Sequence, residues 1–324
     1  MAKGGTRAVV AALIANAIIA VAKFIAAAVT GSSAMLSEGI HSVADSGNQA
    51  LLLFGDRRSR RPPDRTHPFG YGPELYFWSL IVAMILFGLG GGLSIYEGIA
   101  HLDHPVVPSD PLWTYSVLGV AFVVELIALR VALKELGGSS ADGSFLRRLR
   151  ASSDPRVFVP IAEDFAALLG VVIAFAGIFF ARLLDLPMLD AASSIVIGCI
   201  LAGVAVFLAI ETRSLLVGES VDERLVETVR SVCENDPAVE RVVRIRGVYL
   251  GPAEVLLALD VRFRVGPDQE AVAFVVDRLE ERLRAADARI ARILIEPDLA
   301  VEGTAEVTTG SRMSTVGRED GAVP

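Results

Sequence analysis

The chain has 324 residues, of which 53% are hydrophobic, and its mean hydropathy is +0.54. This composition argues against a soluble globular protein, because much of the surface of a soluble protein must be polar. The formal net charge is −8, and the two cysteines, Cys199 and Cys233, form no CxxC motif, so neither a disulfide framework nor a zinc ribbon is supported.

Six long apolar stretches precede residue 218. They cover residues 7–30, 33–55, 75–98, 112–135, 157–183 and 190–217. Each is long enough to cross a hydrocarbon core of about 30 Å as a helix. We therefore predict an α-helical polytopic membrane protein in which residues 1–218 form a domain of six transmembrane helices in contact with membrane lipid.

Basic residues gather in the loops on one side of this predicted bundle. They are Lys3, Arg7, Arg57, Arg58, Arg60, Arg61, Arg65, Lys134, Arg147, Arg148, Arg150, Arg213 and Arg224. The loops on the other side contain a single arginine, Arg182. The positive-inside rule therefore places both termini in the cytoplasm, which agrees with an even number of helices. The short N-terminus has no Arg- and Ser-rich transit pattern, which favours a prokaryotic cell (inner) membrane.

The second apolar stretch carries four hydrophilic side chains on one helical face. Glu38, His41, Asp45 and Asn48 follow one another at i, i+3, i+7 and i+10. A charged side chain at the centre of a bilayer costs roughly 2.5–3.5 kcal/mol on insertion scales. We therefore expect this face to line the bundle interior or a water-filled path. The alternative for His41 is a structural hydrogen bond to a neighbouring helix.

Further acidic residues lie in the fourth and fifth apolar stretches. Glu125 is in the fourth, and its alternative role is an ion pair with Arg130 or a place near the lipid headgroups. The fifth contains Glu163 and Asp164 one turn after Pro160, which lacks a backbone donor. Adjacent residues point about 100° apart on a helix, so Glu163 and Asp164 need not enter one site. A structural ion pair is the alternative for Asp164.

These residue types favour a divalent metal ion as the ligand. His41 and Asp45, at i and i+4, form a chelating pair, and Asp164 offers a further oxygen. Ligation by nitrogen and oxygen suits zinc, although iron, cobalt and nickel accept similar ligands. The ligands must lose protons to bind metal, so metal and protons compete for the same groups, which is a physical basis for antiport.

Residues 219–300 predict a small cytoplasmic α+β domain, in the order helix, strand, strand, helix, strand. This region contains no histidine, so a regulatory zinc cluster is not expected there. Residues 301–324 lack periodicity and predict a disordered tail, and the stretch 137–144 predicts a flexible linker. No P-loop, GxSxG or HExxH motif occurs, so we expect no nucleotide or nucleic-acid partner and no enzymatic activity.

Four segments of the chain carry a resemblance to a known family. They are SSAMLSEGIHSVADSGNQALLLFG, DRTHPFGYG, EDFAALLGVV and DAASSIVIGCILAGVAVFLAIETRSLLVGES. With these, the chain resembles the cation diffusion facilitator family of cation–proton antiporters over about residues 8–298. The runs SEGIHSVADSGNQ, THPFGYG and AEDFAALLG look most like the branch typified by zinc transporter nine.

The resemblance implies a transport site between the second and fifth helices, built from His41, Asp45 and Asp164. The position four residues before Asp164, where the family supplies another ligand, is Pro160 here. We therefore expect a further ligand from Glu163, Asn48, Glu125 or a water molecule.

The loop DRTHPFGYG is similar to a second, cytoplasmic metal site of some members of the family. Asp64 and His67 match that site, but Tyr71 stands where those members have a later histidine. We expect weak or no metal binding there, with a loop-ordering hydrogen bond as the alternative role of His67. The resemblance also implies that the C-terminal domain is of metallochaperone type and holds a homodimer together.

These observations predict efflux of a divalent cation, zinc first, by proton antiport and alternating access. Iron, manganese, cobalt and nickel remain open as substrates. A non-transporting metal sensor or scaffold is the main alternative, and it predicts metal binding without flux. A passive channel is the other alternative, and it predicts flux that needs no proton gradient.

Overall fold

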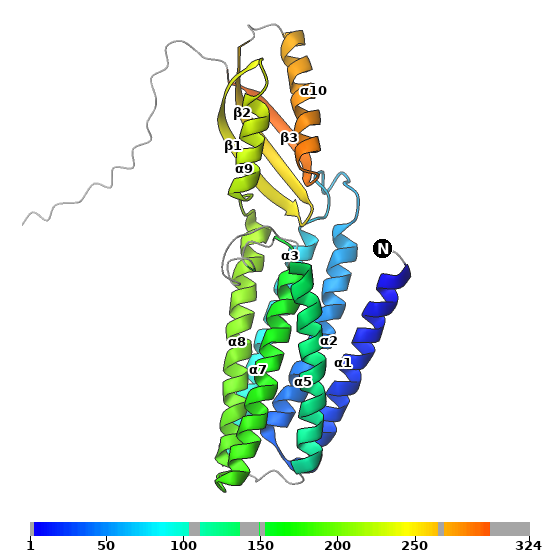
Figure 1. Cartoon of the computed structure of the whole chain (residues 1–324), viewed down its shortest axis with the longest axis vertical. Helices are drawn as coiled ribbons and strands as arrows, with labels where there is room; N and C mark the ends of the chain where they lie inside the picture. The colour runs from blue at the N-terminus through cyan, green and yellow to red at the C-terminus, as the bar shows by residue number, and fades with distance from the viewer. Residues whose placement is uncertain (1–2, 104–110, 137–148, 150–152, 265–268, 299–324) are drawn as a thin grey trace, which may run out of the picture.

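The computed structural model of the chain describes residues 3–103, 111–136, 149, 153–264 and 269–298. The expected tail, 301–324, and the expected linker, 137–144, lie outside these residues. Most of the described chain is helical, and a small sheet lies near its C-terminal end (Figure 1).

The N-terminal part is a bundle of long helices (Figure 1). Its elements are α1 (Lys3–Thr30), α2 (Ser33–Ser59), α3 (Glu74–Ile85), η1 (Leu86–Gly92), α4 (Leu93–Asp103), α5 (Pro111–Leu136), α7 (Pro155–Leu183) and α8 (Met188–Val217). The π-helical segment η1 joins α3 to α4, so that these three form one rod. Gly98 on this rod and Gly198 on α8 lie against the backbone of the opposite helix, where a Cβ would collide. Such small residues allow two helices to approach closely within a membrane.

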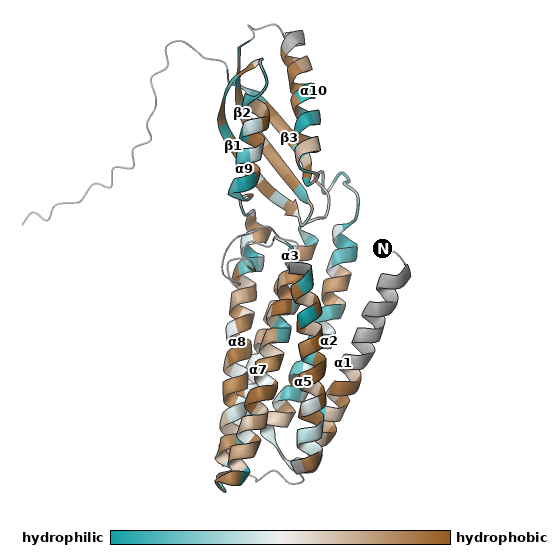
Figure 2. Cartoon of the chain, viewed as in Figure 1, coloured by the Kyte–Doolittle hydropathy of each residue, from teal (hydrophilic) through white to brown (hydrophobic). Residues whose placement is uncertain are grey.

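Among the described residues, four helical rods are long and apolar enough to cross a membrane. They are Glu74–Leu102, Leu112–Lys134, Pro155–Leu183 and Met188–Val217. Within α1, the part whose side chains the structure describes, Ala17–Thr30, is a shorter apolar helix, and the hydrophilic residues of α2 reduce its mean hydropathy. Figure 2 shows this contrast between the mostly hydrophobic residues of α7 and α8 and the mixed hydropathy of the residues of α2. The expectation of six spans is thus met clearly for four of them.

Two buried aspartates tie helices together at opposite ends of the bundle. Near the C-terminal domain, Asp56 of α2 accepts a hydrogen bond of 2.8 Å from Arg156 of α7. At the other end, the Asp190 carboxylate of α8 accepts hydrogen bonds from the Ser32 hydroxyl at 2.6 Å and the Ser33 backbone N–H at 2.7 Å. These contacts fix the ends of α2, and α2 carries the polar face of the bundle.

The C-terminal part contains a three-stranded sheet and two helices. Its elements are α9 (Glu223–Glu234), β1 (Val239–Gly251), β2 (Glu254–Phe263), α10 (Gln269–Ala286) and β3 (Ile290–Pro297). The strand order is β1-β2-β3, with β1 and β2 antiparallel and β2 and β3 parallel across α10. Helix α9 packs on β1 and on α10, which buries apolar residues such as Leu225, Val229, Leu257 and Leu279.

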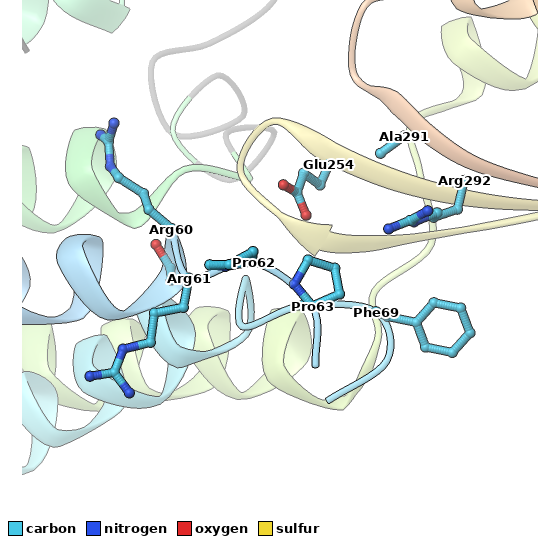
Figure 3. A pocket seen from close by; sticks show the side chains of 10 residues that line it. Arg60, Arg61, Pro62, Pro63, Phe69, Glu254, Ala291 and Arg292 are labelled. Atoms are coloured by element: carbon cyan, nitrogen blue, oxygen red, sulfur yellow. The ribbon is translucent and has the colours of Figure 1, made fainter. Parts of the chain in front are cut away.

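The loop between α2 and α3 touches the turn between β1 and β2. Gly72 lies so close to the Leu250 carbonyl oxygen that a Cβ on this glycine would overlap it. A cavity of about 230 Å³ adjoins this contact, lined by residues of the loop and by Glu254, Ala291 and Arg292. Figure 3 shows that the Arg60 and Arg61 side chains point in different directions, away from Pro62. The guanidinium groups of Arg60 and Arg61 therefore do not converge on one point.

Candidate metal-transport site

The hydrophilic face of α2 is buried inside the bundle. The exposed fractions of its four side chains are 0% for Glu38, 1% for His41, 8% for Asp45 and 0% for Asn48. Their spacing explains the arrangement, because residues three, seven and ten apart lie on one side of a helix. Helix α2 contacts α1, α3, α4, α7 and α8, which together cover this face.

His41 and Asp45 lie together with open ligand atoms. The distance from His41 Nε2 to Asp45 Oδ2 is 3.4 Å. Both ring nitrogens of His41, Asp45 Oδ1 and Asn48 Oδ1 are buried and have no hydrogen-bond partner. Buried polar atoms are nearly always hydrogen-bonded, so a cluster of unsatisfied ones requires an explanation. Nitrogen and oxygen atoms with free lone pairs are what a divalent cation would bind.

Helix α7 brings Glu163 to the same face. The Asn48 amide donates a 2.7 Å hydrogen bond to Glu163 Oε1, and the Glu163 side chain is 2% exposed. Asp164 is only partly buried, as expected for the neighbouring position on a helix. Asp45 nevertheless lies within electrostatic reach of both acids and of Glu125 on α5. The structure thus places three predicted acids, from the two helices α5 and α7, around Asp45.

The ligands are not gathered around one point. Among the described residues, no three His, Cys, Asp or Glu side chains are arranged to hold one metal ion. The side chains instead form two separate pairs, His41 with Asp45 and Asn48 with Glu163. The side chain of Pro160 has no ligand atom. Helix α7 continues through this proline, which therefore does not end the helix. A relative movement of α2 and α7 would be needed to enclose an ion.

A further buried polar residue, Lys23 on α1, was not predicted. This lysine is completely buried, and its ammonium donates hydrogen bonds of 2.9 Å to Glu38 Oε2 and to the Ser42 hydroxyl. Glu38 therefore pairs with a cation rather than facing His41 as an open ligand. A lysine inside an apolar stretch was the signal that could have revealed this pair.

Asp64 and His67 order the loop between α2 and α3. Asp64 Oδ1 accepts hydrogen bonds from the backbone N–H groups of Thr66 and His67, and Oδ2 accepts one of 2.7 Å from the Tyr71 hydroxyl. The bond from Tyr71, followed by those from Thr66 and His67, holds the pKa of Asp64 well below its usual range. The Asp64 carboxylate is thus engaged by its own loop.

Comparison with known proteins identifies the family. A family model described as the cation efflux transmembrane domain matches residues 9–217. The chain belongs to the cation diffusion facilitator family. This match spans all the bundle helices, from α1 to α8, and the family is one of transporters and not of enzymes.

Several curated relatives are similar to this chain. The mitochondrial proton-coupled zinc antiporter SLC30A9 of Xenopus laevis is 36% identical over 263 residues, which are 81% of this chain and 47% of the relative. Metal tolerance protein C4 of Arabidopsis thaliana is 34% identical, over 79% of this chain and 57% of its own length. The manganese efflux system protein MneP of Bacillus subtilis is 28% identical, over 79% and 82%. The chain thus spans about half the length of the first two relatives, and its resemblance to the zinc transporter nine branch is confirmed.

Proposed function

We propose that this protein exports a divalent metal cation, zinc first, in exchange for protons. The metal binds to His41 and Asp45 of α2, with Asp164 and Glu163 of α7 as the facing ligands. The observation that carries this proposal is the group of buried nitrogen and oxygen atoms without partners on α2, opposite the acids of α7. Membership of a cation efflux family supports it.

Alternating access fits the arrangement of the two helices. Asp56 and Arg156 join α2 and α7 at the end near the C-terminal domain, while the candidate ligands lie about two helical turns or more away from this contact along both helices. Movement of α7 against α2 would bring Glu163 and Asp164 towards Asp45 and close the site around an ion. Movement in the other sense would open the site, and protons would then displace the metal.

The proposal includes the placement of the protein in its membrane. Six helical rods cross the bilayer, because the buried polar face of α2 and the buried Lys23 of α1 are covered by the four apolar rods. The basic loop after α2 places both termini and the C-terminal domain in the cytoplasm. We propose a homodimer held by this domain, in a prokaryotic cell membrane.

The choice of metal is open to a direct test. A relative named for zinc is 36% identical to this chain, and one named for manganese is 28% identical. His41 favours zinc, because imidazole suits zinc better than it suits manganese, which prefers oxygen ligands. Flux into proteoliposomes should be measured for zinc, manganese, iron, cobalt and nickel under an imposed pH gradient. Zinc is expected to move fastest.

Two isosteric variants test the site itself. Asp45→Asn and Asp164→Asn keep the side-chain volume and remove one negative charge each, so both should abolish gradient-dependent flux. Ser46→Ala is the matched control, because this hydroxyl donates only to the Ser42 carbonyl of its own helix. Flux that is unchanged in both Asn variants would contradict the site. Stoichiometric metal binding without flux of any ion would instead support a sensor or scaffold.

A further inference from the structure

Lys23 and Glu38 form a completely enclosed ion pair inside the helical bundle. Both side chains have exposed fractions of 0%, and the distance from Lys23 Nζ to Glu38 Oε2 is 2.9 Å. Such a pair is weak evidence for a stabilising role, because removing two charges from water costs about as much as their attraction returns. Two apolar side chains of similar size would serve the packing of α1 on α2 at least as well. The pair therefore calls for a functional explanation.

The pair lies beside the candidate metal site. Glu38 precedes His41 by three residues, which is just under one helical turn of α2. The Lys23 ammonium also donates to the hydroxyl of Ser42, the residue that follows His41. Lys23 is within electrostatic reach of Asp45 and of Glu125 on α5. Its positive charge therefore acts on any cation held by His41 and Asp45.

Helix α7 contacts the Glu38 carboxylate from the other side. A Cβ at Gly170 would overlap Glu38 Oε1, so the carboxylate lies against bare backbone. Oε1 is buried and has no hydrogen-bond partner. One Glu38 oxygen is thus held by Lys23, and the other lies against Gly170 of α7. Without Lys23, this carboxylate would be an unpaired anion less than one helical turn from His41.

Lys23 and Glu38 lie between the candidate metal ligands and the end of the bundle away from the C-terminal domain. Helix α1 ends at Thr30 and α2 begins at Ser33, at the end of the bundle away from the C-terminal domain (Figure 1). Lys23 and Glu38 lie about 10 Å and 8 Å from these ends, at about 1.5 Å per helical residue. His41 and Asp45 are farther from them. In the proposed direction of transport, the metal leaves past this pair.

We propose that Lys23 is a tethered counter-cation that keeps Glu38 out of the metal's coordination shell and weakens metal binding enough to allow release. This inference rests on the proposed function of the His41–Asp45 site. It assigns Lys23 a positioning and affinity-setting role, since its ammonium touches Glu38 and not the metal. This role predicts that neutralising Lys23 and neutralising Glu38 in separate variants change the zinc affinity in opposite directions.

Three variants of the full chain test this inference. Lys23→Met leaves Glu38 without its cation, so zinc should bind about tenfold more tightly and maximal flux should fall as release slows. Glu38→Gln leaves the lysine charge uncompensated, so zinc should bind about tenfold more weakly. The double variant Lys23→Met with Glu38→Gln restores neutrality, and its zinc affinity should return to within about threefold of the wild type.

The measurements are zinc titration calorimetry on the protein in detergent and zinc flux into proteoliposomes. Weaker binding in both single variants, or no change in either, would overturn the inference, because loss of a pair that only holds α1 to α2 would loosen the site and would not tighten zinc binding in Lys23→Met. If Lys23→Met does not fold, Glu38→Gln alone and the double variant still give the comparison, and equal affinity in these two overturns the inference. Wild-type protein that neither binds nor moves zinc would overturn the proposed function. Wild-type flux with unshifted variants would overturn only the role of Lys23.

Discussion

Replacing Asn48 by alanine tests whether the contact between α2 and α7 matters for transport. The Asn48 amide donates to Glu163 Oε1 at 2.7 Å, and neither side chain is more than 2% exposed. Water therefore does not replace the lost donor. A hydrogen bond to a charged group contributes about 1.5–3 kcal/mol. At about 1.4 kcal/mol per factor of ten, metal affinity or maximal flux should fall about ten- to a hundredfold.

The assay is zinc flux into proteoliposomes under a fixed pH gradient, with the zinc concentration varied to separate KM from maximal rate. Ser46→Ala is the control, since Ser46 lies on the same helix and its hydroxyl contacts only the carbonyl of Ser42. This control should transport at close to the wild-type rate. Identical kinetics for Asn48→Ala and Ser46→Ala would refute the reasoning, because they would mean that Glu163 needs no partner from α2.

Three further predictions concern the C-terminal domain and its contact with the bundle. Burial acts to raise the pKa of Asp236, but the hydrogen bonds and positive charge of Arg278 outweigh this effect. They hold the pKa of Asp236 below its ordinary value. Asp236→Ala should therefore lower the free energy of unfolding of the domain by about 2 kcal/mol at neutral pH, and this difference from the wild type should shrink below about pH 4. Hydrogen exchange of α9 and α10 measures it. Burial raises the pKa of the Cys233 thiol to about 11, so at pH 8 about one molecule in a thousand carries the thiolate, and maleimide should label Cys233 only after denaturation. Gly72→Val should loosen the contact with the Leu250 carbonyl and speed hydrogen exchange at the turn between β1 and β2.

Part of the site could be predicted from the sequence because polar residues are costly inside apolar helices. That cost, with the helical period, identified the buried face of α2 that contains His41, Asp45 and Asn48. The same argument applies to Lys23 in the first apolar stretch and would have predicted that it is buried. Its partner could not be predicted, since the choice between Glu38 and the acids of other helices depends on how α1 packs against α2.

The order of the helices and strands could be predicted from the sequence better than the strand pairing and the local helix geometry. The sequence predicted two strands after the first helix of the C-terminal domain, and the structure has β1 and β2 there. The parallel pairing of β2 with β3 was not predicted, because strand partners are set by tertiary packing and not by local pattern. The π-helical segment η1 was likewise missed, since its glycines suit several helical geometries equally well.

The charge of the bundle interior leads to a last prediction about coupling. Five acidic residues lie on the faces of α2, α5 and α7 around the site, and among the described residues one lysine faces them. These acids are Glu38, Asp45, Glu125, Glu163 and Asp164. A low-dielectric interior cannot hold four uncompensated negative charges, so a divalent ion or protons must balance them.

The proposed mechanism therefore predicts that the site does not change its access while it is both empty and deprotonated. Uphill zinc flux should therefore stop when an ionophore collapses the pH gradient. Raising the pH equally on both sides should lower the maximal rate, because the return step needs protons. Lowering the pH should raise KM, because protons then compete with zinc for His41 and Asp45. Flux of unchanged rate across these conditions would indicate a passive channel, since only a channel can conduct metal without returning an empty site.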